Sequence, residues 1–268
     1  MSIKQKKVAC FLLFLSLISC RKDPSNPIIY DVFLVVGQSN NYYGDDLDLL
    51  ASFVESENIK QLGRHDSLNY QIIPATEPLE NHSKPLNKGS YVLTFAKLYA
   101  KNLLDKNHKV LIIPCAKTGT SFIKHDWNKG DKLFTDAVER TSYILRRYRG
   151  SKLSAILWHQ GESDVNNENY QTDLDNFITI IRTELNAKHT PFILGGMVPY
   201  WVKQNNKRKG IQSIIKNTPN RMLYTKYANP EFPFVIEKKD NTVDSIHYNA
   251  KGLRELGQRY FTEFTSFE

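Results

Sequence analysis

Cysteine is scarce in this sequence, with three residues among 268, at positions 10, 20 and 115. Only Cys115 lies in the part of the chain that is expected to fold, so a disulfide within that part is excluded. Cys115 also ends an apolar run, which favours a small core residue over a nucleophile. Stability must therefore come from a hydrophobic core, which a chain of this length can build in one sizeable domain.

An apolar run long enough to cross a membrane is also missing. The apolar segment at residues 8–19 falls short of the roughly 20 residues that a membrane-spanning helix needs. Three lysines precede it within the first seven residues, and a cysteine follows it at position 20. This order predicts a signal peptide over residues 1–19 rather than a membrane helix.

The end of that segment, Leu-Ile-Ser-Cys at residues 17–20, resembles a bacterial lipobox. In a lipobox the cysteine becomes the lipid-modified N-terminus after cleavage; the alternative is an ordinary secretory signal with a coincidental cysteine. We expect lipidation at Cys20, a polar tether over residues 20–27 and a single domain over residues 28–268. This organisation predicts a protein of the bacterial cell envelope that is held at the membrane only by its lipid.

Repeats, heptads and low-complexity tracts are absent, and neither sign of charge dominates. The 41% hydrophobic and 24% charged residues are those of an ordinary globular protein. Without residues 1–19 there remain 33 basic and 28 acidic side chains, a formal charge of +5. An excess of this size is usually a solubility feature, although it also suits an acidic glycan. No nucleic-acid partner is expected.

Short apolar runs alternate with longer amphipathic segments along the chain. The apolar runs predict strands over 28–36, 109–115, 153–158 and 192–198, with shorter ones over 70–73 and 222–227 in a chain otherwise irregular over 61–88. The amphipathic segments predict helices over 46–57, 91–104, 133–148, 170–185, 210–216 and 250–264. Strands separated by helices predict a three-layer α/β/α sandwich with a central parallel sheet.

In such a sheet, ligands bind beyond the carboxyl ends of the strands. Four polar segments follow predicted strands at this edge: residues 37–40, 116–121, 159–164 and 199–201. We therefore expect them to gather on one side of the domain.

The first of these segments reads Gly-Gln-Ser-Asn, and a turn there would lift the hydroxyl of Ser39 above the sheet. Ser39 is a candidate nucleophile, which needs an imidazole to take its proton. Gly37 permits a positive φ, and backbone N–H groups nearby can face an oxyanion. Taken alone, the segment is equally typical of a strand-exit turn with a helix cap.

Asp244 and His247 lie three residues apart, just before the last predicted helix. On one turn the carboxylate can hold the imidazole Nδ1–H and leave Nε2 for a serine. A lone Asp-x-x-His pair is common surface chemistry, and its place before the terminal helix is what singles it out. Together, Ser39, Asp244 and His247 supply the three groups of a nucleophilic hydrolase.

Two further loops carry polar groups. Lys-Thr-Gly-Thr-Ser at residues 117–121 offers the unobstructed N–H of Gly119. In Trp-His-Gln-Gly-Glu-Ser-Asp at residues 158–164, the Gln160 amide can donate to an oxyanion, and His159 and Glu162 are alternatively a buried hydrogen-bonded pair. A metal site of His159, Glu162, Asp164 and His247 has no diagnostic spacing, so no metal is expected.

These segments in this order resemble the SGNH/GDSL hydrolase superfamily. More narrowly, they resemble its sialate O-acetylesterase-like group, which includes the acetyl-xylan esterases of carbohydrate esterase family 6. The blocks are residues 37–40, 118–121, 158–164 and 244–247, and the resemblance covers nearly the whole chain after the tether. It implies a flavodoxin-like SGNH hydrolase fold and chemistry without a cofactor.

Under this resemblance Ser39 is the nucleophile, His247 the general base and then acid, and Asp244 its orienting acid. The oxyanion hole would consist of the backbone N–H groups of Ser39 and Gly119 and the side chain of Gln160. Glu162 would support this hole or the histidine. The reaction implied is acyl transfer through an acetyl-serine intermediate.

The chain departs from that group at two positions. Asn41 stands where the group has methionine, so the loop beside the nucleophile is expected to pack differently. Thr118 replaces a glycine, and it can reach the same place only with a negative φ.

The sequence thus predicts a serine esterase that removes O-acetyl groups from carbohydrate, whether sialic acid, xylan or another acetylated glycan. One alternative is a broader lipase or arylesterase of the same superfamily. The other is a non-catalytic glycan-binding lipoprotein with an aromatic platform drawn from Tyr42, Tyr43, Trp127, Tyr200 and Trp201.

Overall fold

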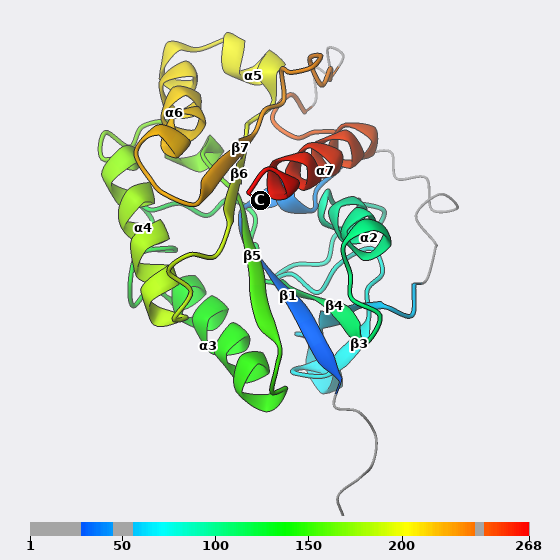
Figure 1. Cartoon of the computed structure of the whole chain (residues 1–268). Helices are drawn as coiled ribbons and strands as arrows, with labels where there is room; N and C mark the ends of the chain where they lie inside the picture. The colour runs from blue at the N-terminus through cyan, green and yellow to red at the C-terminus, as the bar shows by residue number, and fades with distance from the viewer. Residues whose placement is uncertain (1–27, 45–55, 239–243, 268) are drawn as a thin grey trace, which may run out of the picture.

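The structure is a computed structural model, and it describes residues 28–44, 56–238 and 244–267. The predicted signal peptide, Cys20 and the tether lie outside these residues, as does nearly all of the helix expected over 46–57. The described chain forms a three-layer α/β/α sandwich around one central sheet (Figure 1). The predicted fold class is confirmed.

The sheet has seven strands in the order β3-β2-β4-β1-β5-β6-β7. All neighbouring pairs are parallel except β2 and β3. The strands are β1 (Ile29–Gly37), β2 (Ile59–Leu62), β3 (Ile72–Pro74), β4 (His108–Pro114), β5 (Lys152–His159), β6 (Phe192–Gly195) and β7 (Thr225–Ala228).

Helices cover both faces of this sheet. Figure 1 shows α3, α4 and α6 on one side and α2 and α7 on the other. The helices are α2 (Val92–Asn102), α3 (Lys132–Arg147), α4 (Tyr170–Glu184), α5 (Pro199–Lys203), α6 (Asn206–Lys216) and α7 (Ala250–Thr265). Short 3₁₀ helices are η1 (Ser39–Asn41), η2 (Asp66–Leu68), η3 (Glu162–Asp164) and η4 (Thr218–Asn220).

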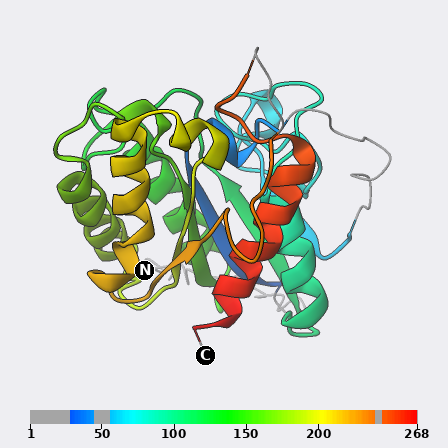
Figure 2. The same cartoon turned by 90° about the horizontal axis from the view of Figure 1, so that it is seen from above.

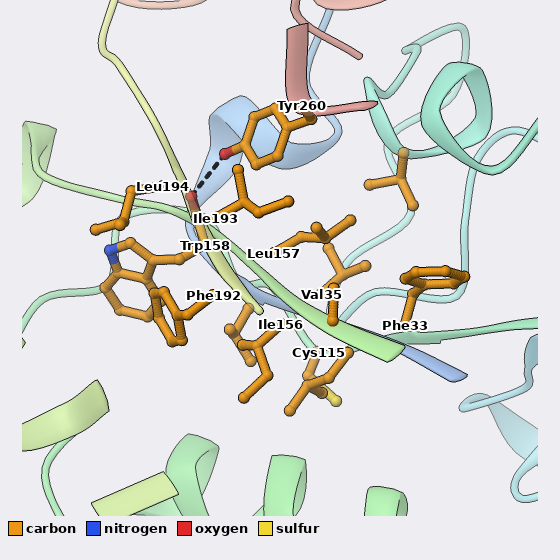
Figure 3. Packing of buried hydrophobic residues seen from close by; sticks show 14 of the residues in the cluster. Phe33, Val35, Cys115, Ile156, Leu157, Trp158, Phe192, Ile193, Leu194 and Tyr260 are labelled. Carbon is orange, nitrogen blue, oxygen red and sulfur yellow. Dashed lines mark hydrogen bonds between the residues drawn. The ribbon is translucent and has the colours of Figure 1, made fainter. Parts of the chain in front are cut away.

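The central strands are buried on both faces, as a doubly covered parallel sheet requires. In β1, five successive residues from Val32 to Val36 are fully buried. The side of the sheet under α7 is closed by Tyr260, whose hydroxyl donates to the Trp158 carbonyl at 2.6 Å (Figure 3). This rigid centre carries the loops at the carboxyl edge of the sheet, which Figure 2 shows from above.

The differences from the predicted elements lie at the margins of the sheet. β2 was not predicted, and its last two residues lie in the stretch predicted to be irregular; a four-residue strand has too little periodicity to be seen. The strand predicted over 70–73 is the antiparallel β3. The chain after β6 forms α5 rather than a loop, and α6 begins earlier than predicted, because Asn205 caps it by accepting from two backbone N–H groups.

Within the described segments, no helix combines the length and the apolar character needed to cross a membrane.

Candidate active site

The serine loop follows β1 directly. Gly37 has φ +115°, and a Cβ there would lie 2.2 Å from the backbone oxygen of His159, so the close approach of β5 requires glycine. The N–H of Gln38 donates to the same carbonyl at 2.8 Å and ties the turn to β5. Ser39 begins η1 and is 2% exposed. The turn thus places Ser39 at the carboxyl edge of the sheet.

A hydroxyl, an imidazole and a carboxylate lie in line at this point. His247 Nε2 is 2.8 Å from Ser39 Oγ, and His247 Nδ1 is 2.8 Å from Asp244 Oδ2. Asp244 Oδ1 accepts from the N–H groups of Ile246 and His247 at 3.2 and 3.1 Å, which holds the carboxylate within its own turn. The structure therefore brings together the three residues that the sequence placed at opposite ends of the domain.

The surroundings of Asp244 keep its carboxylate charged. Partial burial acts to raise the pKa of Asp244, but the hydrogen bond and charge of His247 outweigh it and hold the pKa below its usual range. Lys238 adds a positive charge 3.7 Å from Asp244 Oδ1 and also donates to the His247 carbonyl. No motif marks Lys238, so sequence reasoning could not have found it.

Asn40 connects the serine to the histidine loop. Its Nδ2 donates to the Ile246 carbonyl at 3.0 Å, and its Oδ1 accepts from the Tyr248 N–H at 3.0 Å. These two residues flank His247, so one side chain fixes the backbone on both sides of the imidazole. Asn40 was visible in the sequence only as part of the serine segment, without a role.

Glu162 fixes the side chain of Asn40 by a hydrogen bond. Glu162 Oε1 accepts from Asn40 Nδ2 at 2.5 Å and lies 3.6 Å from His159 Nε2, with both acidic and imidazole side chains fully buried. Burial acts to raise the pKa of Glu162, but the His159 imidazole and the Asn40 amide lower it below its usual range. His159 and Glu162 are thus a close buried pair, although at 3.6 Å they are not the hydrogen-bonded pair considered from the sequence. Through Asn40, Glu162 supports the histidine loop.

The glycine loop lies against the serine loop. The Lys117 N–H donates to the Gly37 carbonyl at 3.0 Å, and the Tyr42 hydroxyl contacts both Thr118 Oγ1 and the Thr118 N–H, at 2.7 and 2.9 Å. Gly119 has φ +71°, and a Cβ built on it would meet no atom within 4 Å. The space beside the Gly119 Cα is therefore open, and a ligand could approach the loop there.

Gln160 does not have the arrangement that the sequence suggested. Its side-chain amide donates to Asp164 Oδ2 at 2.6 Å and to the Thr120 carbonyl at 3.3 Å, and the residue is fully buried. Because both bonds use the amide N–H groups, the side chain is not free to donate to an oxyanion. In this structure Gln160 fixes the backbone next to Gly119, and its direct place in the oxyanion hole is corrected to that role.

The two departures from the family pattern are accommodated. Asn41 is buried; its Nδ2 donates to the carbonyls of Gln38 and His159 at 2.8 and 3.2 Å, and its Oδ1 accepts from the Tyr91 hydroxyl. This is the different packing expected beside the nucleophile. Thr118 is not among the described residues with positive φ, so it meets the condition set for replacing glycine.

The candidate aromatic platform is mostly core. Tyr42, Trp127 and Trp201 are at most 7% exposed. Tyr200 remains exposed on α5, and the ring of Tyr43 lies 4.7 Å from the His247 ring at an interplanar angle of 37°. Tyr43 is thus the aromatic side chain in contact with the proposed base.

The residues considered for a metal are used otherwise. Asp164 accepts from the Phe122 N–H at 3.0 Å and from Asn167 at 3.2 Å, besides Gln160. Over the ranges that the structure describes, no three His, Cys, Asp or Glu side chains group closely enough to hold a metal ion.

This fold, with a serine, an imidazole and a carboxylate in line at the carboxyl edge of its sheet, is that of an SGNH-type ester hydrolase. Residues 29–266 match the family described as carbohydrate esterase, sialic acid-specific acetylesterase. The chain belongs to this family, whose members are carboxylic ester hydrolases.

Two curated proteins and one solved structure illustrate the similarity. The chain is 26% identical over 248 residues to the probable 9-O-acetyl-N-acetylneuraminic acid deacetylase of Escherichia coli (strain K12), covering 74% of this chain and 76% of that protein. It is 36% identical over 98 residues to a probable carbohydrate esterase of Arabidopsis thaliana, a match that spans 35% of this chain and 36% of that protein. The crystal structure of NanS shares the fold with a TM-score of 0.75 at 20% identity, covering 91% of this chain and 98% of that one.

Proposed function

We propose that this protein removes O-acetyl groups from carbohydrate, with Ser39 as nucleophile. The observation that carries the proposal is the imidazole of His247, which lies 2.8 Å from both the Ser39 hydroxyl and the Asp244 carboxylate. A family of carbohydrate esterases supplies the context in which this geometry performs acyl transfer.

In the first step Ser39 Oγ attacks the carbonyl carbon of the acetyl ester, and its proton passes to His247 Nε2. The tetrahedral intermediate collapses, the C–O bond to the sugar breaks, and the sugar oxygen takes the proton from His247. This leaves acetyl-Ser39. Throughout, Asp244 holds Nδ1–H and stabilises the imidazolium that forms.

In the second step water attacks acetyl-Ser39 and gives a proton to His247 Nε2. Collapse returns the proton to Ser39 Oγ and releases acetic acid, which loses its remaining proton to solvent, so the enzyme is regenerated. No redox change occurs and the residues of this chain supply every proton transfer.

The oxyanion hole of this proposal consists of two backbone N–H groups, those of Ser39 and Gly119. Such donors are effective because they are fixed before the charge develops, and removing one donor typically costs about 10²–10³ in rate. Gln160 contributes by holding the Thr120 carbonyl, and with it the Gly119 loop.

For substrate and place, we propose an acetylated glycan outside the cytoplasm and a lipid anchor at Cys20. The E. coli relative is named for deacetylation of 9-O-acetyl-N-acetylneuraminic acid, which makes O-acetyl sialic acid the first substrate to test. The lipobox-like residues 17–20 support the anchor.

The test is acetate release from O-acetyl sialic acid, acetylated xylan and 4-nitrophenyl acetate by the wild type and by Ser39→Ala. We expect release by the wild type and a loss of about 10⁴–10⁶ in kcat in the variant, because the triad acts as a unit. Ser163→Ala is the matched control: this serine lies in η3 of the same edge and has no place in the mechanism. A Ser39→Ala variant with an unchanged rate would refute the mechanism, and turnover restricted to long acyl esters would favour a lipase.

A further inference from the structure

The edge of the sheet opposite the serine carries a basic patch. We define it as the exposed or half-exposed side chains Lys106, Lys109, Arg146, Arg147, Arg149 and Lys152. They lie at the end of α3 and at the starts of β4 and β5. No aspartate or glutamate occurs between Glu139 and Glu162, so the α3–β5 connection is purely basic.

The patch surrounds the point where the described chain begins. β4 places His108 beside Ile29 and Lys109 beside Tyr30, and β5 places Lys152 beside Asp31. The connection after α3 is equally close: Ser151 Oγ accepts from the Tyr30 N–H at 2.9 Å. In Figure 1 the lower end of β1 lies near the last turn of α3.

Two acidic residues, Asp31 and Asp105, offset part of the positive charge of the patch. Asp31 is buried, 3.1 Å from His108 Nδ1 and 3.7 Å from Lys152 Nζ. Asp105 is exposed and lies 3.8 Å from His108. The three arginines of the patch, Arg146, Arg147 and Arg149, have no acidic partner among the ion pairs of the described residues.

We propose that this basic patch lies against an anionic lipid surface and turns the active site toward the aqueous side. The inference rests on the anchor of the proposed function, since Cys20 lies only eight positions before Ile28, the first described residue. A tether of that length reaches at most about 3.5 Å per residue, so the lipid surface and the patch must be near neighbours. Lipid anchors are commonly reinforced by a polybasic surface in this way.

The direction of β1 sets the consequence for the active site. β1 starts within the patch and ends at Gly37, two residues before Ser39. Nine residues of strand span about 30 Å. With the patch on the membrane, the serine faces away from it, so the acetyl groups it reaches belong to glycans presented from solution or from an opposing surface.

The experiment uses the mature lipidated protein reconstituted on the outside of vesicles that contain a fluorescent acceptor lipid. Two matched Asn→Cys variants carry a donor dye: Asn107→Cys within the patch and Asn206→Cys at the start of α6, at the other edge. Cys115 does not compete for the dye, because it is fully buried and burial raises its pKa to about 12.

With phosphatidylglycerol in the vesicles we expect strong energy transfer from position 107 and weak transfer from position 206. With phosphatidylcholine alone, or at high salt, the two signals should converge, because screening weakens exposed charges. Combined Arg146→Glu, Arg147→Glu and Arg149→Glu should remove the difference, while reversing Lys203, Lys207 and Lys209 on α5 and α6 should not.

Equal transfer from both positions on anionic vesicles would overturn the proposal, as would a difference that survives the arginine reversals. Release of the orientation by a soluble anionic polysaccharide at matched ionic strength would assign the patch to glycan instead. A mature protein that mass spectrometry shows to carry no lipid at Cys20 would also overturn the proposal. Hydrolysis of soluble 4-nitrophenyl acetate by the arginine variant is measured separately, so failure of the esterase and failure of the orientation are distinguished.

Discussion

Two carboxylates at the active edge, those of Asp244 and Glu162, are both held charged and yet stand in different relations to the chemistry. Asp244 is 22% exposed in its side chain and contacts the imidazole that faces Ser39. Glu162 is fully buried and contacts Asn40 and His159. In the proposed mechanism the first orients the group that moves protons, whereas the second fixes the loops that carry such groups.

The difference shows that a polar residue near a catalytic serine need not act on it. Removing the charge of Asp244 leaves most of the fold intact because the group is close to solvent. Removing the charge of Glu162 weakens the contacts of a fully buried group with Asn40 and His159, and that is costly. A substitution at Asp244 should therefore lower mainly the catalytic rate, and a substitution at Glu162 should lower mainly the stability.

The largest effect is expected for Asp244→Asn. The variant keeps the shape of the side chain but no longer stabilises the imidazolium, so we expect kcat to fall by about 10⁴. Its melting temperature at neutral pH should fall only modestly, because the stabilising charge that is lost belongs to a partly exposed group. Steady-state hydrolysis of 4-nitrophenyl acetate and a thermal melt measure both; a rate within tenfold of the wild type would show that another carboxylate orients His247.

A smaller loss of rate is expected for Asn40→Ala. This change removes the bonds to the Ile246 carbonyl and the Tyr248 N–H, so the imidazole is positioned less well. A loss of about 10² in kcat with little change in KM is the expected result, since poor alignment penalises the chemical step. The matched control is Asn205→Ala, which loses a helix cap at α6 and should keep its kcat.

Glu162→Gln should have the opposite effect to Asp244→Asn, with a large loss of stability and a small loss of rate. We expect a loss of stability of about 1–3 kcal/mol, because the amide that replaces the carboxylate satisfies the buried Asn40 and His159 side chains less well. The rate of the folded fraction should stay within about tenfold, since the glutamine can still accept from Asn40. Chemical denaturation and active-site titration separate the two quantities, and a large rate loss in a fully folded variant would contradict the division of roles.

A third acid, Glu77, sharpens the comparison through pH. Burial raises the pKa of Glu77 to about 7, although its Oε1 accepts from the N–H and hydroxyl of Ser90 at 2.8 Å. A carboxyl whose folded pKa exceeds its unfolded value stabilises the fold at low pH and loses that contribution as pH rises from about 4.5 to 7. We expect the loss to be about 3 kcal/mol at most.

Glu77→Gln should therefore raise the unfolding free energy at pH 8 relative to the wild type and have little effect at pH 4.5. Denaturation curves at the two pH values measure this difference. Asp244 has the opposite sign: its pKa is lowered, so its contribution is present above its unfolded pKa and disappears as pH falls through the folded value. Equal stability of the wild type and Glu77→Gln at pH 8 would contradict the raised pKa.

The central strands and the serine, acid and histidine could be predicted from the sequence because each depends on local pattern. β1 is one continuous apolar run, and Asp244 and His247 meet within one turn. β2 could not be predicted, since four residues at the margin of the sheet leave no periodicity.

The support of the site was equally hidden. The amides of Asn40 and Gln160 each have several polar neighbours in space. Which of these neighbours each amide binds depends on packing, and no sequence motif records it. The Gln160 amide faces Asp164 and the Thr120 carbonyl rather than the open space beside Gly119. Residue type therefore predicted the triad but not which amides support it.

The most direct test of the account is covalent labelling of the nucleophile. The wild type is treated with a serine-reactive phosphonate ester, digested and mapped by mass spectrometry while residual esterase activity is followed. We predict one adduct per chain, on Ser39, with activity lost in proportion to labelling and no adduct in His247→Ala over the same time. Complete inactivation with Ser39 unmodified, or with the adduct on another serine such as Ser121, would contradict the assignment.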